Sequence, residues 1–348
     1  MRALLSWEAF DAEHGWRAET TAAPDGRRVT VLLGPEQPAP APFTEAIASW
    51  SATTPAGSWI EVQLRVRRAG HWTGFYRIAQ WDSRCEGSLR RSFDAQPDDD
   101  GRVATDTLAL VGAADMIQPR LLLYAAGDEQ PALRVLRIAL SAPAERARPA
   151  AQRAFAVREL PIPPRSQMDY PNGDIICSPT VVTMLLAYWH TRTGEERLAP
   201  FAEQCAVSDL VAPQVYDPVY EGHGNWSFNT AFAASCGLDA YVAQLGGLDE
   251  VEPWIAVGVP VAISVAWQAG ELANAPIRSS TGHLLIVSGF DGHGGVIVAD
   301  PRGERVDEVR RIYDAAQIES AWQHGSAGMV YLIHPYGWPA PSRGASWY

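Results

Sequence analysis

The chain has 348 residues, of which 47% are hydrophobic and 20% are charged, as in an ordinary globular protein. Domains typically contain about 100–200 residues, so this length predicts two domains. The net charge of -12 argues against a nucleic-acid-binding protein, which needs a basic patch to neutralise phosphates.

The sequence shows neither a membrane span nor a signal peptide. No apolar run approaches the ~20 residues that a membrane-spanning helix needs. The first residues, MRALLSWEAFDAEHGW, contain an apolar stretch too short for the core of a signal peptide, and no small-residue cleavage site follows. The sequence as it stands therefore predicts a cytoplasmic protein, although a secreted protein whose leader had been removed would look the same.

Residues 1–142 are predicted to form an all-β domain. In the clearest strand, residues 58–68, the alternation places one face on a core and the other in water. The core face would hold Ile60, Val62, Leu64 and Val66, and the water face Glu61, Gln63, Arg65 and Arg67. Further strand-like runs, separated by turn-rich segments, are Phe75 to Trp81, Thr107 to Val111, Arg120 to Ala125 and Leu133 to Leu140. Several short strands without helical periods are typical of a β-sandwich or jelly roll.

A linker is predicted at residues 143–164, where prolines cluster at both ends. After it the composition changes, because helical patterns now mix with strands. Residues 165–348 are therefore predicted to form a second domain of the α+β class.

The cysteines, at positions 85, 177, 205 and 236, are too widely spread to suggest a disulfide scaffold. No CxxC pair, HExxH motif or Cys/His cluster offers the spacing of metal ligands, so no metal or other cofactor is predicted. Cys85, Cys205 and Cys236 are interpreted as small buried hydrophobes. Cys177 differs from them because of its neighbours.

Cys177 lies where a helix is predicted to begin. In the run CSPTVVTMLLAYWH, apolar residues between positions 182 and 189 recur with the spacing of one helix face. Ser178 suits the N-cap position and Pro179 the first turn. The partial positive charge at a helix N-terminus stabilises a thiolate. Cys177 is therefore a candidate nucleophile, although a buried, inert cysteine before a helix is equally common.

A thiol nucleophile needs a base that takes its proton and a third group that orients the base. The segment TGHLLIVSGFDGHGGVIVADPRG contains both, because His283 precedes one predicted strand and Asp300 follows the next. A two-residue turn at Asp291-Gly292 would place His283 directly opposite Asp300, with Cβ atoms ~5 Å apart. A turn at Gly294-Gly295 would lose this pairing, and a slightly longer loop would leave a diagonal contact. Alternatively, both are ordinary residues at strand ends.

The segment from about Pro161 to Pro335 resembles the papain-like cysteine peptidases of the double-glycine leader-peptidase type, and more closely the bacterial peptidase-like proteins similar to them. The resemblance rests on SQMDYPNGDIICSPTVVTMLLAYW, GNWSFNTAFAASCGLDAYV, GVPVAISVAW, GHLLIVSGF and ADPRG. The leader peptidases usually have Cys-Gly-Pro where this chain has Cys-Ser-Pro, and related sequences often have Asn where this chain has Ala299.

The resemblance implies a papain-like α+β fold with Cys177, His283 and Asp300 as a catalytic triad, since their order in the chain matches the order in that family. It also implies an oxyanion-hole role for Gln167, which lies ten positions before the nucleophile.

These residues predict a thiol hydrolase that cleaves a peptide or other amide bond through an acyl-thioester. Two alternatives stay open. The same triad could serve a transglutaminase-like acyltransferase, or the chain could be a non-catalytic protein that binds carbohydrate or a cell surface, since its 13 Trp residues allow sugar stacking. The expected partners are a peptide or amide substrate for the second domain and a carbohydrate or cell-surface ligand for the first.

Overall fold

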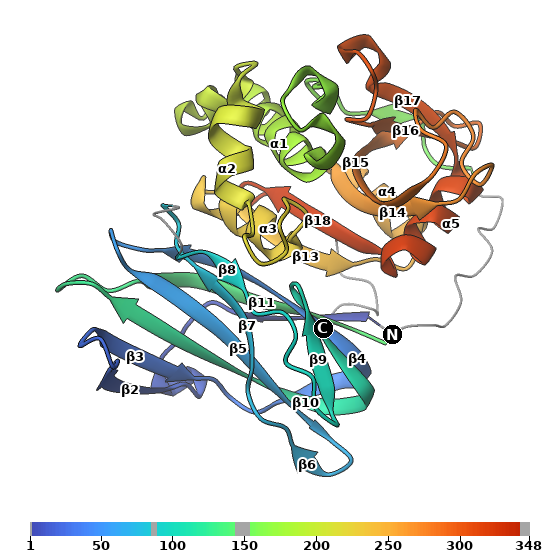
Figure 1. The fold of residues 1–348 in the computed structure, drawn as a ribbon. Coiled ribbons are helices and arrows are strands. Elements are labelled where there is room, and N and C mark those ends of the chain that lie inside the picture. Colours follow the sequence, from blue (N-terminus) through green and yellow to red (C-terminus); the bar gives the residue numbers. More distant parts are fainter. Residues whose placement is uncertain (1, 85–88, 143–153, 342–348) are drawn as a thin grey trace. The chain divides into compact units, whose positions relative to one another are not determined.

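The structure is a computed structural model that describes residues 2–84, 89–142 and 154–341. Among these residues the chain divides into two compact units, one of residues 2–142 and 216–235 and the other of residues 154–215 and 236–341 (Figure 1). Both units are rich in strands. The domain boundaries expected from the sequence stay a prediction, and part of the expected linker, residues 143–153, lies outside the described residues.

The first unit is built on one sheet of antiparallel strands whose main path runs β1-β11-β4-β10-β5-β7-β8. Strand β10 changes neighbours along its length, because its first residues lie between β4 and β9 and its last between β5 and β3. The sheet therefore bends, and the ring centroid of Trp50 of β4 lies 6.2 Å from that of Trp81 of β7 although β10 and β5 separate these strands in the sheet order. The elements are β1 (Arg2–Trp7), β2 (Arg17–Ala22), β3 (Arg28–Leu33), β4 (Gln37–Thr53), β5 (Trp59–Arg68), β6 (His71–Trp72), β7 (Tyr76–Trp81), β8 (Arg91–Ser92), β9 (Gly101–Ala104), β10 (Thr107–Ala125), β11 (Ala132–Ser141) and the helix α3 (Trp226–Ser235).

Strand β5 follows the predicted alternation on one face only. Its alternate apolar residues from Ile60 to Val66 are fully buried, as expected. Glu61 and Gln63, expected to face water, are only 2% and 5% exposed, so this part of the prediction is wrong. The reason is that longer side chains cover them: Arg77 donates two hydrogen bonds to Glu61, and Arg120 donates one to Gln63.

Helix α3, from the middle of the chain, completes the core of the first unit. It packs on β4, where the Ser227 hydroxyl donates to the Ala48 carbonyl oxygen over 2.7 Å. Phe228 is fully buried, with its ring centroid 5.3 Å from that of Trp81 and 6.4 Å from that of Trp50. The sequence-based boundaries assign this helix to the second domain, whereas in the structure its side chains belong to the core of the first.

The second unit is built on an antiparallel sheet of order β13-β18-β14-β15-β16-β17, with β12 paired to β15. Helix α1 packs against β15 and helix α5 against β14 (Figure 1). The elements are β12 (Arg158–Glu159), α1 (Cys177–Thr193), α2 (Ala212–Val215), β13 (Asp239–Gln244), α4 (Leu248–Ala256), β14 (Val261–Trp267), β15 (Ser280–Phe290), β16 (Gly295–Ala299), β17 (Arg310–Asp314), α5 (Ala315–Ser326) and β18 (Met329–His334). This packing brings the beginning of α1 to the strand that carries His283.

Helix α1 begins at Cys177, at the place that the sequence predicts. Its residues from Ser178 to Trp189 are all buried, so the helix is enclosed on every side rather than on the single face expected. The N-cap role expected of Ser178 is wrong: the residue lies inside the first turn, and its hydroxyl forms a 2.9 Å hydrogen bond with the hydroxyl of Tyr331. In the part of the chain that the structure describes, no helix is both long and apolar enough to cross a membrane.

Candidate active site

Cys177 places its thiol at the N-terminal end of α1, where the helix dipole favours a negative charge. The sharp entry into the helix is made by Asn172, which adopts a left-handed conformation (φ 59°), and by a short 3-10 helix at Gly173–Ile175. His283 and the backbone N–H groups of Leu284 and Ser178 lie close enough to the sulfur to lower the pKa of the thiol. The residue is half-buried, so it combines strong polar contacts with access from solvent.

His283 links this thiol to a carboxylate. Its backbone lies in β15 opposite Val265 of β14, and its side chain is only 5% exposed. The ring nitrogen Nε2 lies 2.7 Å from Oδ1 of Asp300, which leaves Nδ1 for the contact with Cys177. The His283 ring is therefore bonded to Asp300 and lies beside the thiol of Cys177.

The direct strand pairing expected for His283 and Asp300 is wrong. Strand β15 pairs Ile286 with Ala299 of β16, a register in which Asp300 lies diagonally across from His283. The loop between the strands is longer than a two-residue turn, because the Asp291 carboxylate accepts hydrogen bonds from the backbone N–H groups of His293 (2.7 Å) and Gly295 (2.8 Å). The diagonal contact expected for a longer loop is the one observed.

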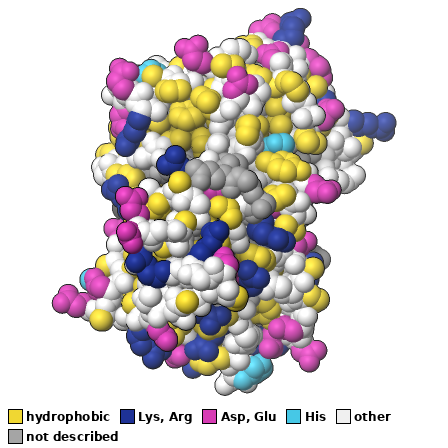
Figure 2. Space-filling view, turned by 60° about the vertical axis from the view of Figure 1, so that its left-hand side comes forward, with side chains coloured by type: hydrophobic (Ala, Val, Ile, Leu, Met, Phe, Trp, Pro, Cys, Tyr) yellow, Lys and Arg dark blue, Asp and Glu magenta, His cyan; other side chains and the backbone are white. Residues whose placement is uncertain are grey.

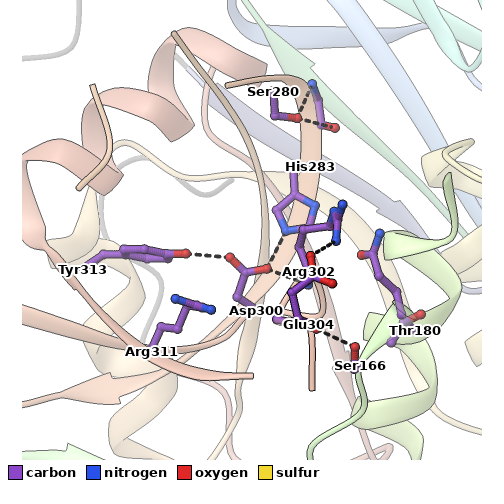
Figure 3. A network of polar contacts seen from close by, with 12 residues as sticks. Ser166, Thr180, Ser280, His283, Asp300, Arg302, Glu304, Arg311 and Tyr313 are labelled. Atoms are coloured by element: carbon purple, nitrogen blue, oxygen red, sulfur yellow. Dashed lines mark hydrogen bonds and ion pairs between the residues drawn. The ribbon is translucent and has the colours of Figure 1, made fainter. Parts of the chain in front are cut away.

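Asp300 is held from several sides (Figure 3). Its Oδ1 accepts the backbone N–H of Arg302 at 2.9 Å in addition to the His283 ring, and its Oδ2 accepts the Tyr313 hydroxyl at 2.6 Å. Asp300 and Tyr313 are both fully buried. The carboxylate is therefore fixed in orientation, with both oxygens hydrogen-bonded.

The ionisable groups of the site shift one another's pKa values. Burial alone would raise the pKa of the Cys177 thiol, but the hydrogen bond and the charge of His283 lower that pKa below its ordinary value. Burial would lower the pKa of His283, but the Asp300 carboxylate outweighs it and raises the pKa to about 10. Burial would raise the pKa of Asp300, whereas His283, Tyr313 and the Arg302 N–H together lower it. Together these shifts favour a thiolate beside an imidazolium, with the carboxylate ionised.

Gln167 links the turn before Cys177 to the residue after Asp300 through two hydrogen bonds. Its backbone N–H donates to the Pro301 carbonyl oxygen (2.8 Å), directly after Asp300. Its side-chain Nε2 donates to the carbonyl oxygen of Gly173, in the turn that leads to Cys177. The side chain is 1% exposed, and its Oε1 has no hydrogen-bond partner among the described residues. The amide is therefore buried beside the nucleophile turn.

Two aromatic residues at the site have no signal in the sequence analysis. Tyr313 comes from β17, two strands away from His283, and could be found only from the pairing of β16 with β17, which sets it opposite Val296. Trp267, at the end of β14, places its ring edge-on to the His283 imidazole, with centroids 6.0 Å apart. Both are buried and limit the access of water to the ion pair.

The other cysteines differ partly from their expected burial. Cys205 is exposed and Cys236 is half-buried, so their interpretation as small buried hydrophobes is wrong, and Cys85 lies outside the described residues. Among the described residues, no group of three or more His, Cys, Asp or Glu side chains could hold a metal ion.

Comparisons with known proteins agree on a family for each part of the chain. Residues 159–328 match the Peptidase_C39 like family, and residues 11–141 match the Peptidase C39 N-terminal domain. No curated protein matches the chain. Two solved structures are similar to parts of it, a chain from Bacillus anthracis assigned as a C39-like peptidase and the C-terminal CBM6 of a marine laminarinase from Zobellia galactanivorans.

The similarity to these structures is low. The Bacillus anthracis chain is 15% identical, with a TM-score of 0.34, over 53% of this chain and 98% of its own. The CBM6 is 12% identical, with a TM-score of 0.20, over 39% of this chain and 98% of its own. The family assignment therefore rests on the two family matches. Through residues 159–328 the chain belongs to the Peptidase_C39 like family, and a Peptidase C39 N-terminal domain precedes them.

Proposed function

We propose that the protein is a thiol hydrolase that cleaves a peptide or other amide bond with a triad of Cys177, His283 and Asp300. The observation that carries the proposal is the buried 2.7 Å contact between His283 and Asp300, beside which His283 lowers the pKa of the Cys177 thiol. Membership of the Peptidase_C39 like family supports a hydrolase of the cysteine-peptidase type. The packing of α1 on an antiparallel sheet supports a papain-like α+β fold for the second unit, and the bent sheet supports a β-sandwich for the first.

In the proposed reaction, the Cys177 thiolate attacks the carbonyl carbon of the substrate amide. The oxyanion accepts hydrogen bonds from the Cys177 backbone N–H, which has no partner within the helix at this first position, and from the Gln167 amide. As the C–N bond breaks, Nδ1 of the His283 imidazolium gives its proton to the leaving amine. Water then attacks the thioester while His283 takes its proton, and the thiolate leaves. Asp300 stays ionised and holds the ring in the required orientation.

The proposal is tested first by the reactivity of Cys177, which needs no knowledge of the substrate. A thiol held as thiolate at slightly acid pH is expected to react with iodoacetamide at least about tenfold faster than an ordinary thiol. Cys205, which is exposed and free, is the internal reference in the same chain. Site-resolved mass spectrometry should show preferential labelling of Cys177, and His283→Ala should abolish the preference. Equal labelling rates of Cys177 and Cys205 would contradict the proposal that Cys177 is the nucleophile.

Turnover is tested with a mixture of peptides whose cleavage products are identified by mass spectrometry. Cys177→Ala is expected to abolish cleavage, while Cys205→Ala leaves it unchanged. Full cleavage by Cys177→Ala would overturn the assignment of the nucleophile. The same reaction with added amine acceptors distinguishes hydrolysis from acyl transfer, because an acyltransferase would release amine conjugates instead of free acids. For the first unit, a carbohydrate or another cell-surface ligand is the proposed partner.

A further inference from the structure

The outer face of β5 and β10 in the first unit carries a pair of arginines around one aromatic ring. Arg65 of β5 and Arg120 of β10 both lie over Phe75, with guanidinium carbons 5.0 Å and 3.8 Å from the ring centroid. All 28 basic residues of the chain are arginines, whose planar fork matches carboxylates in two-point geometry. We call this group the two-arginine site. It consists of Arg65, Arg120 and Phe75, together with Gln63 and Gln118, whose amides hold the arginines.

Each arginine is fixed by a neutral partner. The Nε of Arg120 donates to Oε1 of Gln63 over 2.6 Å, and the Nε of Arg65 donates to Oε1 of Gln118 over 2.7 Å. Both amides are buried, and Gln118 is anchored in turn by its donation to the Gly34 carbonyl oxygen (2.7 Å). The guanidinium planes are therefore oriented by neutral amides, and Arg65 also forms an ion pair with Glu36 (3.5 Å).

Arg120 forms no ion pair of its own among the described residues: Glu61 attracts it, but this carboxylate is already paired with Arg77. Among the described residues, no acidic side chain lies within 4.0 Å of its nitrogens, and its terminal nitrogens form no hydrogen bond there. Burial lowers the pKa of Arg120; the charge of Glu61 opposes this shift, and the neighbouring Arg65 adds to it. Arg77 on the same face shows the contrast, because its two hydrogen bonds to Glu61 raise its pKa. An oriented, half-buried guanidinium whose terminal nitrogens have no hydrogen-bond partner among the described residues is suited to an anionic ligand.

The surroundings favour a polysaccharide over a peptide. Strand β5 lies between β7 and β10, and the last part of β10 lies between β5 and β3, so no free strand edge is available here for a peptide to extend the sheet. The face instead carries planar side chains at both ends: Trp59 stacks on Tyr124 (4.7 Å, 15°) and lies under Arg27 (4.6 Å), and Trp72 lies under Arg65 (4.7 Å). Figure 2 shows Arg side chains on the first unit lying close together with hydrophobic side chains between them. Flat groups and fixed hydrogen-bond donors suit sugar rings and their substituents.

We propose that the two-arginine site binds a carboxylated polysaccharide, with one sugar carboxylate between the guanidinium groups of Arg65 and Arg120. This inference specifies the partner proposed above for the first unit. It does not depend on Cys177, so each proposal can fail without the other.

The test measures binding of the full-length protein to de-esterified polygalacturonate, with the fully methyl-esterified polymer as the neutral control. Binding to the acidic polymer is expected, together with at least about tenfold weaker binding to the ester, because the two-point contact with the carboxylate is lost. Arg120→Gln is expected to weaken binding to the acidic polymer by a similar factor. Arg17→Gln removes an exposed arginine from β2 and is expected to leave binding unchanged.

Three outcomes would overturn the inference. These are equal binding of the esterified polymer, equal or tighter binding of poly-glutamate, and equal weakening by Arg17→Gln and Arg120→Gln. If circular dichroism shows that Arg120→Gln disturbs the fold, Arg65→Lys provides the second variant. It keeps the charge but loses the planar fork, and binding unchanged in Arg65→Lys would also contradict the proposal. Cys177→Ala is expected to bind as the wild type does.

Discussion

Replacing Tyr313 by Phe removes one hydrogen bond from the Asp300 carboxylate and keeps the ring. The Tyr313 hydroxyl lies 2.6 Å from Oδ2, and both residues are fully buried, so water is not at hand to replace the lost donor. A hydrogen bond to a charged group contributes about 1.5–3 kcal/mol. Since one pKa unit corresponds to about 1.4 kcal/mol, the pKa of Asp300 is expected to rise by about 1–2 units.

The consequence is measurable in the pH dependence of Cys177 alkylation by iodoacetamide. Below the pKa of Asp300 the carboxyl group is protonated and no longer fixes the orientation of the His283 ring, so the thiol loses the contact with His283 that lowers its pKa. The acid limb of the alkylation profile is therefore expected to move to higher pH by about 1–2 units in Tyr313→Phe. The measurement follows the labelling rate of Cys177 alone, and it needs no substrate.

The control for this variant is Tyr331→Phe. Tyr331 is also fully buried in the second unit, but its hydroxyl bonds to Ser178 and not to the carboxylate. The acid limb is expected to stay in place in this variant. An unmoved acid limb in a folded Tyr313→Phe protein would refute the reasoning, and an equal shift in both variants would show that loss of a buried hydroxyl, rather than loss of the Asp300 contact, moves the profile.

Three further predictions concern pH, the oxyanion and the core. Hydrolysis is expected to fall as the pH rises through about 10, the pKa of His283, because only the imidazolium can protonate the leaving amine, and a pH–rate profile that falls near neutrality would contradict this. Gln167→Ala is expected to lower kcat by about 10²–10³-fold in single-turnover measurements if its amide holds the oxyanion, and an unchanged kcat would exclude that role. Phe228→Ala is expected to cost about 3–5 kcal/mol in denaturant unfolding of the full chain, and Val111→Ala, at 72% exposure, less than about 0.5 kcal/mol. Equal costs for these two variants would show that α3 is not part of the core.

The positions of the candidate site residues are accessible from the sequence because each stands at the end of a segment with a clear pattern. Cys177 precedes a long apolar run that can only be a buried element, and His283 and Asp300 flank two short apolar strands. Their strand register is not accessible in the same way. It depends on the Asp291 side chain, which accepts the N–H groups of the loop and makes it longer than the residue types Asp-Gly suggest.

Contacts between segments that lie far apart in the chain could not be predicted from local sequence patterns. Tyr313 reaches Asp300 only because β17 pairs with β16, and the residues around it, RRIYD, carry no mark of that role. The burial of Glu61 likewise depends on Arg77 from the neighbouring strand, whereas the alternation along β5 by itself places a carboxylate in water. In each case the decisive partner lies on another strand, beyond the reach of a period of two or of 3.6 residues.

The membership of α3 in the core of the first unit has a consequence for the order of events during synthesis. The residues up to position 142 emerge from the ribosome first, but the ring of Phe228 that packs against Trp50 and Trp81 is made only after the whole nucleophile helix has been translated. The core of the N-terminal unit is therefore complete only after α3, which is encoded between Cys177 and His283, has been translated. A gene fragment that ends before α3 therefore encodes a sheet without its last core helix.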